Sequence, residues 1–270
     1  MRLVSYTGGF GRLEGEVVVP MGENIVEWLE TGAAHDGAAI PLASLDLLAP
    51  VPRPRTIVCI GRNYVAHAHE RGFDPPAEPI LFPKFGPSVA PPGAVVVIPR
   101  VVEEPDYEAE LGVVIGRRAK DVQRADALDH VAGYTCVNDL SARDLQRRGG
   151  QWTRGKAIDG FLPMGPELVT PDEVGDPHQL QIECRVNGET VQSANTSLMI
   201  FPIDELIAFI TQTVTLEPGD VIATGTPSGI GAAMDPPRFL SDGDVVEVEI
   251  ERVGRLETRI SAPHRPASTS

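Results

Sequence analysis

The sequence of 270 residues predicts an α+β fold dominated by a rolled-up β-sheet. The first observation is a succession of short apolar stretches, rich in Val and Ile and bounded by Pro or Gly turns, which is typical of strands. Beyond residue 55 these stretches are IVCIG, AVVVIP, ELGVVIG, VAGYTCVND, QIECRVNG, DVIATG, DVVEVEIE and LETRIS. The second observation is that only three segments there, around 64–71, 141–147 and 203–213, have helical spacing. Three helices are too few for the regular alternation of a parallel α/β fold.

The third observation is that the N-terminal part has strands and a helix of its own. Residues 3–6 and 12–19 are expected to form strands separated by the turn TGGFG, and ENIVEWLETG has helical spacing and a glycine stop. The proline-rich segment APVPRPR can form neither a helix nor a central strand, so it marks a boundary. These features divide the chain into a small N-terminal domain at 1–50, a larger domain at 55–262 and a disordered tail at 263–270.

The charge balance bears on the kind of partner. The formal net charge is −15, which argues against nucleic acid and against anionic membrane surfaces, because both need clustered Lys and Arg. An anionic metabolite must therefore be attracted by a metal ion or by local cations. Lysine is rare in this chain, so Lys84, Lys120 and Lys156 are each candidates for a specific role. A compact ammonium group suits a site that must stabilise an oxyanion, although an ordinary surface lysine is the alternative.

The cysteines and the first residues indicate the compartment. Cys59, Cys136 and Cys184 are odd in number and widely spaced, which indicates buried thiols rather than disulfides or a zinc site. The start MRLVSYTGGFGRLEGEV has no secretory leader pattern, and no run approaches the length of a membrane span. We therefore expect a soluble, cytoplasmic protein.

The stretch DYEAELGVVIG places three acids at alternate positions of one expected strand. Alternate side chains of a strand share a face, so Asp106, Glu108 and Glu110 should point the same way. A solvated face is the alternative, but the strand continues as an apolar run that looks buried on both sides. Two unit charges about 7 Å apart repel by about 2.4 kcal/mol at an effective dielectric near 20. A half-buried row of acids therefore indicates protonation or a bound divalent cation.

A second acidic signal lies in GYTCVNDLSARDLQ. Asp139 follows an apolar strand at a corner where side chains commonly line a site, although turn chemistry alone would also explain it. Ser141 and Asp144 resemble a capping box that opens a helix. We therefore expect Asp144 to be a helix cap.

The segment GRNYVAHAHERG contains a histidine and a glutamate on one helical face. If residues 64–71 are helical and Gly72 ends the helix, His67 and Glu70 are three residues apart and adjacent. A carboxylate beside an imidazole raises its basicity and fixes its orientation, as a general base requires. A surface ion pair is the alternative. His69 lies on another face, where solvent is the expected partner.

Two further segments could contribute to a site. GKAID contains Lys156, and ATGTPSGIG contains Thr224, Thr226 and several glycines. The latter lacks the ending of a phosphate-binding loop, which argues against a nucleotide site. Its backbone N–H groups and a hydroxyl could hold a carboxylate, or it could be a tight turn.

These motifs, in this order, resemble those of the fumarylacetoacetate hydrolase family over about residues 55–260. The segments that carry the resemblance are GRNYVAHAHE, DYEAELGVVIG, GYTCVNDLSARDLQ, QWTRGKAIDGFLPMGPELVT, VNGETVQSANTSLMIF and LEPGDVIATGTPSGIG. The resemblance implies a mixed β-roll preceded by a small N-terminal domain, and a homodimer.

The resemblance also implies roles for individual residues. It places metal ligands at Glu108, Glu110 and Asp139, with Asp106 beside them or a ligand only in some members. It places a water-activating pair at His67 and Glu70 and an active-site lysine at Lys156. Substrate contacts are expected at Arg62, Lys84, Gln146 and Thr226.

The expected chemistry follows from this site. A small 2-oxo acid can chelate Mg²⁺ or Mn²⁺, ions that suit carboxylate ligands, and the metal then stabilises an enolate. The first expectation is hydrolysis of the carbon–carbon bond of a 2,4-dioxo acid to pyruvate and a carboxylic acid. Alternatives within the family are isomerisation of a 2-hydroxyhepta-2,4-diene-1,7-dioate or decarboxylation of an oxaloacetate-like acid. A non-catalytic ligand-binding protein of the same fold is the alternative of another class.

Overall fold

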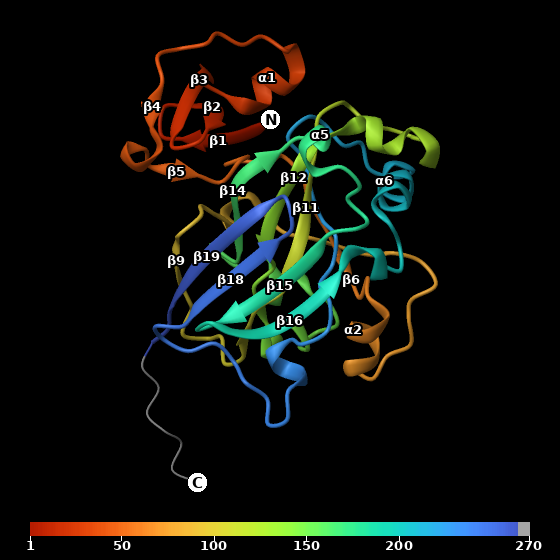
Figure 1. The fold of residues 1–270 in the computed structure, drawn as a ribbon. Helices are drawn as coiled ribbons and strands as arrows, with labels where there is room; N and C mark the ends of the chain where they lie inside the picture. The colour runs from red at the N-terminus through yellow and green to blue at the C-terminus, as the bar shows by residue number, and fades with distance from the viewer. Residues whose placement is uncertain (264–270) are drawn as a thin grey trace.

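The computed structural model describes residues 1–263, and its architecture is the strand-rich α+β fold that the sequence predicts. A large mixed sheet and a five-stranded sheet pack face to face, and a few short helices lie around them (Figure 1). The tail predicted for 263–270 lies outside the described residues apart from Pro263.

The large sheet has twelve strands, ten of them in the order β4-β3-β2-β1-β14-β12-β11-β17-β6-β7, with β5 paired to β1 and β8 to β14. It is mixed, because β11 and β12 are antiparallel whereas β17 and β6 are parallel. The strands are β1 (Arg2–Tyr6), β2 (Gly9–Glu14), β3 (Val17–Gly22), β4 (Ile40–Pro41), β5 (Leu47–Leu48), β6 (Ile57–Gly61), β7 (Ile80–Pro83), β8 (Val89–Ala90), β11 (Ala109–Ile115), β12 (Val131–Asn138), β14 (Leu162–Val169) and β17 (Val221–Ala223).

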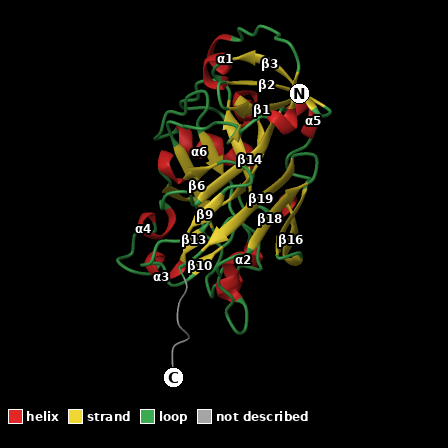
Figure 2. Ribbon diagram, turned by 90° about the vertical axis from the view of Figure 1, so that its left-hand side faces the viewer, coloured by secondary structure: helices red, strands yellow, loops and turns green. Residues whose placement is uncertain are grey.

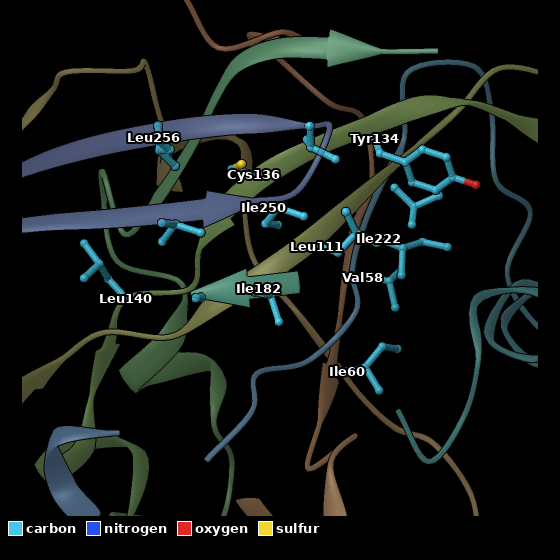
Figure 3. Close-up of a cluster of buried hydrophobic side chains, with 14 of the residues drawn as sticks. Val58, Ile60, Leu111, Tyr134, Cys136, Leu140, Ile182, Ile222, Ile250 and Leu256 are labelled. Atoms are coloured by element: carbon cyan, nitrogen blue, oxygen red, sulfur yellow. The ribbon is translucent and has the colours of Figure 1, made fainter. Parts of the chain in front are cut away.

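The second sheet covers the middle of the first. Its order is β16-β15-β18-β19-β9, and its strands are β9 (Val95–Val97), β15 (Gln181–Val186), β16 (Glu189–Asn195), β18 (Val245–Ile250) and β19 (Gly254–Ser261). Figure 3 shows the core between the sheets, where Leu111 and Cys136 of the large sheet lie among Ile182, Ile250 and Leu256. The alternation of apolar residues along β15 and β19 gives each strand one face for this core.

The N-terminal unit continues the large sheet. Strand β1 pairs antiparallel with β14, in the register Leu3↔Leu168. The expected single strand at 12–19 is wrong: the chain turns between β2 and β3 at Gly15, whose φ is 63°. Glycine accepts this left-handed conformation, so a hairpin forms where the apolar pattern suggested one strand. The sheet therefore passes from the N-terminal unit into the larger domain, and the division near residue 50 stays a prediction.

The helices are short. They are α1 (Ile25–Thr31), α2 (Val65–Glu70), α3 (Arg143–Gln146), α4 (Thr153–Lys156), α5 (Pro171–Val174) and α6 (Ile203–Thr211), with 3₁₀ turns η1 (Leu42–Ser44), η2 (Gly86–Ser88), η3 (Arg124–His130), η4 (Thr196–Leu198) and η5 (Gly231–Ala233). Figure 2 shows α2, α3, α4 and the two-stranded pair β10 (Pro105–Asp106) and β13 (Ser141–Ala142) at the end of the molecule away from β1–β3. None of the helices within residues 1–263 is long and apolar enough to cross a membrane.

Strand β11 is the structural centre of the large sheet. All seven of its residues are buried, as the apolar run predicts, and it lies between β12 and β17. Gly112 is required here, because a Cβ atom would lie 2.7 Å from the side chain of Val137. This rigid strand begins one residue after Glu108, so it holds the acidic motif at the end of the molecule where α2, α3 and α4 lie.

Candidate active site

Three buried carboxylates meet at the N-terminal end of β11. One oxygen each from Glu108, Glu110 and Asp139 lies within 4.8 Å of the others. The antiparallel pairing of β11 with β12 explains the meeting, because it sets Ala109 opposite Asn138 and so brings the end of β12 to the start of β11. The backbone N–H of Asp139 donates to the carbonyl of Glu108 at 2.8 Å, which fixes the two segments together.

Asp106 does not join this cluster, so the expectation of three acids on one face of one strand is wrong. The strand is interrupted: β10 ends at Asp106 and β11 begins at Ala109. The carboxylate of Asp106 instead pairs with Arg143 Nε at 2.8 Å and accepts from the N–H groups of Gly231 and Ala232 at 2.8 and 3.1 Å. These partners come from distant segments and turn the side chain away from Glu108 and Glu110.

Lys156 lies directly against the carboxylate cluster. Its Nζ is 2.5 Å from Glu108 Oε2 and 2.8 Å from Asp139 Oδ2. Burial lowers the pKa of this lysine, but Asp139 and Glu108 more than offset the effect and raise it overall. Lys156 is therefore a cation at neutral pH, as the expected role at an oxyanion requires.

Lys84 lies behind the cluster and does not line the cavity, so its expected contact with substrate stays a prediction that this position does not favour. Its side chain is fully buried, with Nζ 2.7 Å from Asp139 Oδ1. The same nitrogen donates to three backbone carbonyl oxygens, those of Leu140, Lys156 and Phe161. All its hydrogen-bonding capacity is used within the protein, so Lys84 orients Asp139.

Arg143 is the third cation at the cluster, a role that its local sequence does not predict. It bridges Asp106 and Glu108, with Nη2 2.7 Å from Glu108 Oε1. The capping box expected at Ser141 and Asp144 is absent: Ala142 is the N-cap of α3 without a side-chain bond, and Asp144 accepts instead from the N–H groups at 103 and 104. The helix predicted for 141–147 is accordingly shorter.

The two glutamates of the cluster differ in electrostatic environment. Burial would raise the pKa of Glu108, but Lys156 and then Arg143 outweigh it and hold the pKa well below its usual value. Burial raises the pKa of Glu110 well above its usual value, and Asp139 and Glu108 add to the effect. Among residues 1–263, Glu110 makes no ion pair with Lys, Arg or His. Its hydrogen-bond partner is the N–H of Gly225, at 2.8 Å.

This donor set fits a divalent metal ion. All the converging atoms are carboxylate oxygens, the ligands that Mg²⁺ and Mn²⁺ prefer. The site contains four buried acids, Asp106, Glu108, Glu110 and Asp139, and three buried cations, Lys84, Arg143 and Lys156. The acid without a cationic partner is Glu110, which belongs to the cluster. A divalent ion there would compensate Glu110.

Helix α2 carries the predicted histidine–glutamate pair. His67 Nδ1 and Glu70 Oε1 are 2.7 Å apart, and both side chains are largely buried, so they are not a solvated surface pair. Glu70 Oε2 accepts from the N–H of Gly229 at 2.8 Å, which fixes the carboxylate on its other side. With Nδ1–H donated to Glu70, Nε2 is the basic nitrogen of the imidazole. His69 is exposed, as expected.

The glycine-rich segment 225–231 organises the acids around the site. Gly225, Gly229 and Gly231 each donate a backbone N–H to one carboxylate, those of Glu110, Glu70 and Asp106 respectively. The sequence left open whether this segment holds a carboxylate or forms a tight turn. Its N–H groups do hold carboxylates, and these belong to the protein.

We expect Gly229→Ala to impair catalysis without removing any side chain of the site. Gly229 has a φ of 105°, and a Cβ atom would collide with the carbonyl oxygen of Val191. The segment must shift, which weakens the bond to Glu70 and loosens His67. We expect kcat to fall about tenfold, in line with a loss of about 1.4 kcal/mol. Gly243→Ala, at a positive φ with open space around it, is the matched control, and an equal effect of both variants would contradict this account.

Gln192 is another site residue that the sequence did not reveal. Its side-chain amide donates to Thr226 Oγ1 and to the carbonyl of Pro227, both at 2.8 Å, while its oxygen accepts from the N–H of Ala109 at 2.9 Å. It therefore joins β16 to the start of β11 and orients the Thr226 hydroxyl. A lone glutamine in an amphipathic strand gives no signal of this.

These groups surround one cavity of about 240 Å³. Every predicted site residue lines it except Glu70, Lys84 and Asp139. Each of these three contacts another site residue from behind: Glu70 contacts His67, Lys84 contacts Asp139, and Asp139 contacts Lys156. Arg62, Gln146 and Thr226, expected to contact substrate, all face the cavity. Four arginines and two aromatic residues of the loops, Phe73 and Trp152, also line it. The site therefore combines hard oxygen ligands, a base and several cations around one cavity.

The fold and site define a class: a strand-rich mixed-sheet protein with a buried carboxylate cluster beside a His–Glu dyad. The family described as fumarylacetoacetate (FAA) hydrolase C-terminal matches residues 56–261. The chain belongs to the fumarylacetoacetate hydrolase family.

Relatives in this family include enzymes with different reactions. The human protein named oxaloacetate tautomerase FAHD2A, mitochondrial, is 50% identical over 223 residues, which is 82% of this chain and 71% of the human one. The solved structure of fumarylacetoacetate hydrolase from Exiguobacterium antarcticum is 36% identical, with a TM-score of 0.88 over 97% of this chain and 100% of that one. The 2-hydroxyhepta-2,4-diene-1,7-dioate isomerase structure from Mycobacterium marinum is also 36% identical, with a TM-score of 0.85 over 98% and 100%.

Proposed function

We propose that this protein is a divalent-metal-dependent enzyme that interconverts the keto and enol forms of a short 2-oxo acid, with oxaloacetate as the first candidate. The observation that carries the proposal is that one cavity is lined both by His67 of the buried His67–Glu70 dyad and by Glu108 and Glu110 of the carboxylate cluster. The name of the human relative at 50% identity supports oxaloacetate as the substrate. Mg²⁺ or Mn²⁺ as the cofactor belongs to the same proposal.

Glu108, Glu110 and Asp139 would hold the metal ion. The bound ion would supply Lewis-acid polarisation of the 2-oxo group and neutralise charge that develops on its oxygen. Ion pairs keep two of these ligands in place: Lys84 holds Asp139, and Arg143 holds Glu108.

The proton transfer is assigned to His67. Its Nε2 takes a proton from C3 of the keto acid, and the electron pair of that C–H bond becomes the C2–C3 double bond of the enol. Glu70 stabilises the imidazolium that forms, since it already accepts from Nδ1. Lys156 places a positive charge at the developing C2 oxyanion. A proton from solvent then completes the enol, and the imidazolium of His67 returns its proton to solvent. The reverse steps return the keto form.

The direct test is to follow the near-ultraviolet absorbance of enol oxaloacetate after mixing with the protein and Mg²⁺. We expect the absorbance to decay faster than in buffer with Mg²⁺ alone, and we expect EDTA to abolish the acceleration. Adding excess Mg²⁺ back should restore it. An acceleration that survives EDTA, or none in the metal-loaded protein, would contradict the proposal.

Hydrolysis of a 2,4-dioxo acid is the second candidate, because a buried His–Glu dyad can deprotonate water as well as carbon. The name of the Exiguobacterium antarcticum structure supports this candidate. Release of pyruvate from an acylpyruvate would identify it. The homodimer and the cytoplasmic location stay predictions.

A further inference from the structure

Two arginines of the cavity have no acidic partner. Four arginines line it: Arg143 pairs with Asp106 and Glu108, and Arg147 pairs with both carboxylate oxygens of Glu104. Arg62 and Arg71 make no ion pair with any carboxylate of residues 1–263. In a chain whose net charge is −15, two guanidinium groups without a direct ion pair at one cavity point to an anion.

The guanidinium of Arg62 stacks on one aromatic ring and lies near a second. It lies 3.5 Å from the ring centre of Phe73 and 5.5 Å from that of Trp152. Trp152 is itself fixed, because it packs edge-on against Phe82 and covers Gly61, where a Cβ atom would collide with it. Stacking leaves the N–H edges of a guanidinium free for a planar carboxylate.

The backbone of Arg62 supports the same conclusion. Its φ is 56°, in the left-handed region that a non-glycine residue rarely adopts. Such a conformation persists where the surroundings fix it, and it occurs often at ligand-binding sites. Here it directs the side chain to the cavity rather than to solvent.

Arg71 is half-buried and weakly bonded. Its side chain makes a long hydrogen bond of 3.5 Å from Nη1 to the carbonyl of Ala232. Burial and then the neighbouring charge of Arg143 lower the pKa of Arg71, and Asp106 and Glu70 offset only part of this effect. Burial and then Arg71 lower the pKa of Arg62. The two groups therefore repel each other and gain from an anion placed between them.

We infer that Arg62 and Arg71 bind the distal carboxylate of the substrate and make the enzyme selective for 2-oxo dicarboxylic acids over 2-oxo monocarboxylic acids. This inference rests on the proposed function, because it assumes that the 2-oxo end lies at Glu108, Glu110 and Asp139. The distal carboxylate then meets two guanidinium groups at another part of the same cavity. No other cation that lines the cavity lacks an acidic partner among the described residues.

The test compares oxaloacetate with its C4 monomethyl ester, in which the distal carboxylate is masked. We expect Arg71→Gln and Arg62→Gln each to lower kcat/KM for oxaloacetate about 10- to 100-fold, the range for a lost charge-assisted hydrogen bond. Turnover of the ester should change little. Arg71→Lys should retain part of the preference because it keeps the charge. Arg148→Gln, which removes an exposed positive charge on the neighbouring loop, is the matched control and should preserve the preference. Equal losses on both substrates, or no loss on either, would overturn the inference.

A binding measurement separates this inference from the proposed function. Calorimetry in the presence of Mg²⁺ should show that oxaloacetate binds the wild-type protein more tightly than pyruvate does, and that Arg71→Gln removes the difference. If this pattern appears without tautomerase activity, the inference stands and the proposed reaction falls. If tautomerase activity is present but Arg71→Gln leaves the preference unchanged, the inference falls alone.

Discussion

Replacing His67 by alanine is expected to reduce keto–enol turnover by about a thousandfold, within the range for loss of a general base. Among residues 1–263, His67 is the one histidine that lines the cavity, so no second imidazole there can substitute for its Nε2. The affinity for Mg²⁺ should stay unchanged, because the three carboxylates do not depend on His67 for their hydrogen bonds. Stopped-flow decay of the enol absorbance measures the first effect, and calorimetry measures the second.

His69→Ala is the matched control for this experiment. His69 lies on the same helix but is exposed to solvent, so its removal should leave turnover at the wild-type level. Glu70→Gln should give an intermediate loss, because it keeps an acceptor for Nδ1–H but removes the charge that stabilises the imidazolium. Unchanged turnover in His67→Ala would refute the assignment of the base.

Neutralising either glutamate of the cluster is expected to weaken Mg²⁺ binding by about 100-fold or more, since even partners of metal ligands contribute 10- to 100-fold. Without metal, the two substitutions should change the free energy of unfolding in opposite directions. Glu110→Gln removes a buried carboxylate that has no cationic partner and repels Glu108 and Asp139, while its amide oxygen can still accept from Gly225. We expect the free energy of unfolding to rise by about 1–3 kcal/mol.

Glu108→Gln should instead destabilise the metal-free protein by about 3 kcal/mol, because it removes one of the two acidic partners from each of two buried cations. Both Lys156 and Arg143 lose an ion pair in this variant, at 2.5 and 2.7 Å. Urea denaturation in EDTA gives the stabilities, and titration with MgCl₂ gives the affinities. A loss of stability in both variants would contradict the charge distribution described here, and wild-type Mg²⁺ affinity in either would remove that residue from the ligand set.

The parts of the fold and site that the sequence predicts are those with strong local patterns. Strand β11 and helix α6 follow from apolar periodicity, and the His67–Glu70 contact follows from a spacing of three residues on a helix. The convergence of Glu108, Glu110 and Asp139 was also predicted, with the family resemblance joining the two segments.

The parts that the sequence does not predict depend on partners far along the chain. Asp106 continues the alternation of the acidic motif, yet a bond to Gly231 and an ion pair with Arg143 turn it away. Lys84 resembled a substrate ligand, yet Asp139 and three carbonyl groups use all its donors. Arg71 was not predicted, because nothing local distinguishes a cation without a partner from one with a partner. Tertiary contacts, rather than local propensity, decide each of these cases.

We propose that Glu108, Glu110 and Asp139 together hold one divalent cation that binds the 2-oxo acid. Anomalous diffraction from crystals grown with MnCl₂ and oxalate, collected on either side of the manganese absorption edge, tests it most directly. We expect one manganese peak within coordination distance of all three carboxylates, with oxalate bound to the metal on its cavity side. Crystals saturated with manganese that show no peak between these carboxylates, or a peak bound elsewhere, would contradict it.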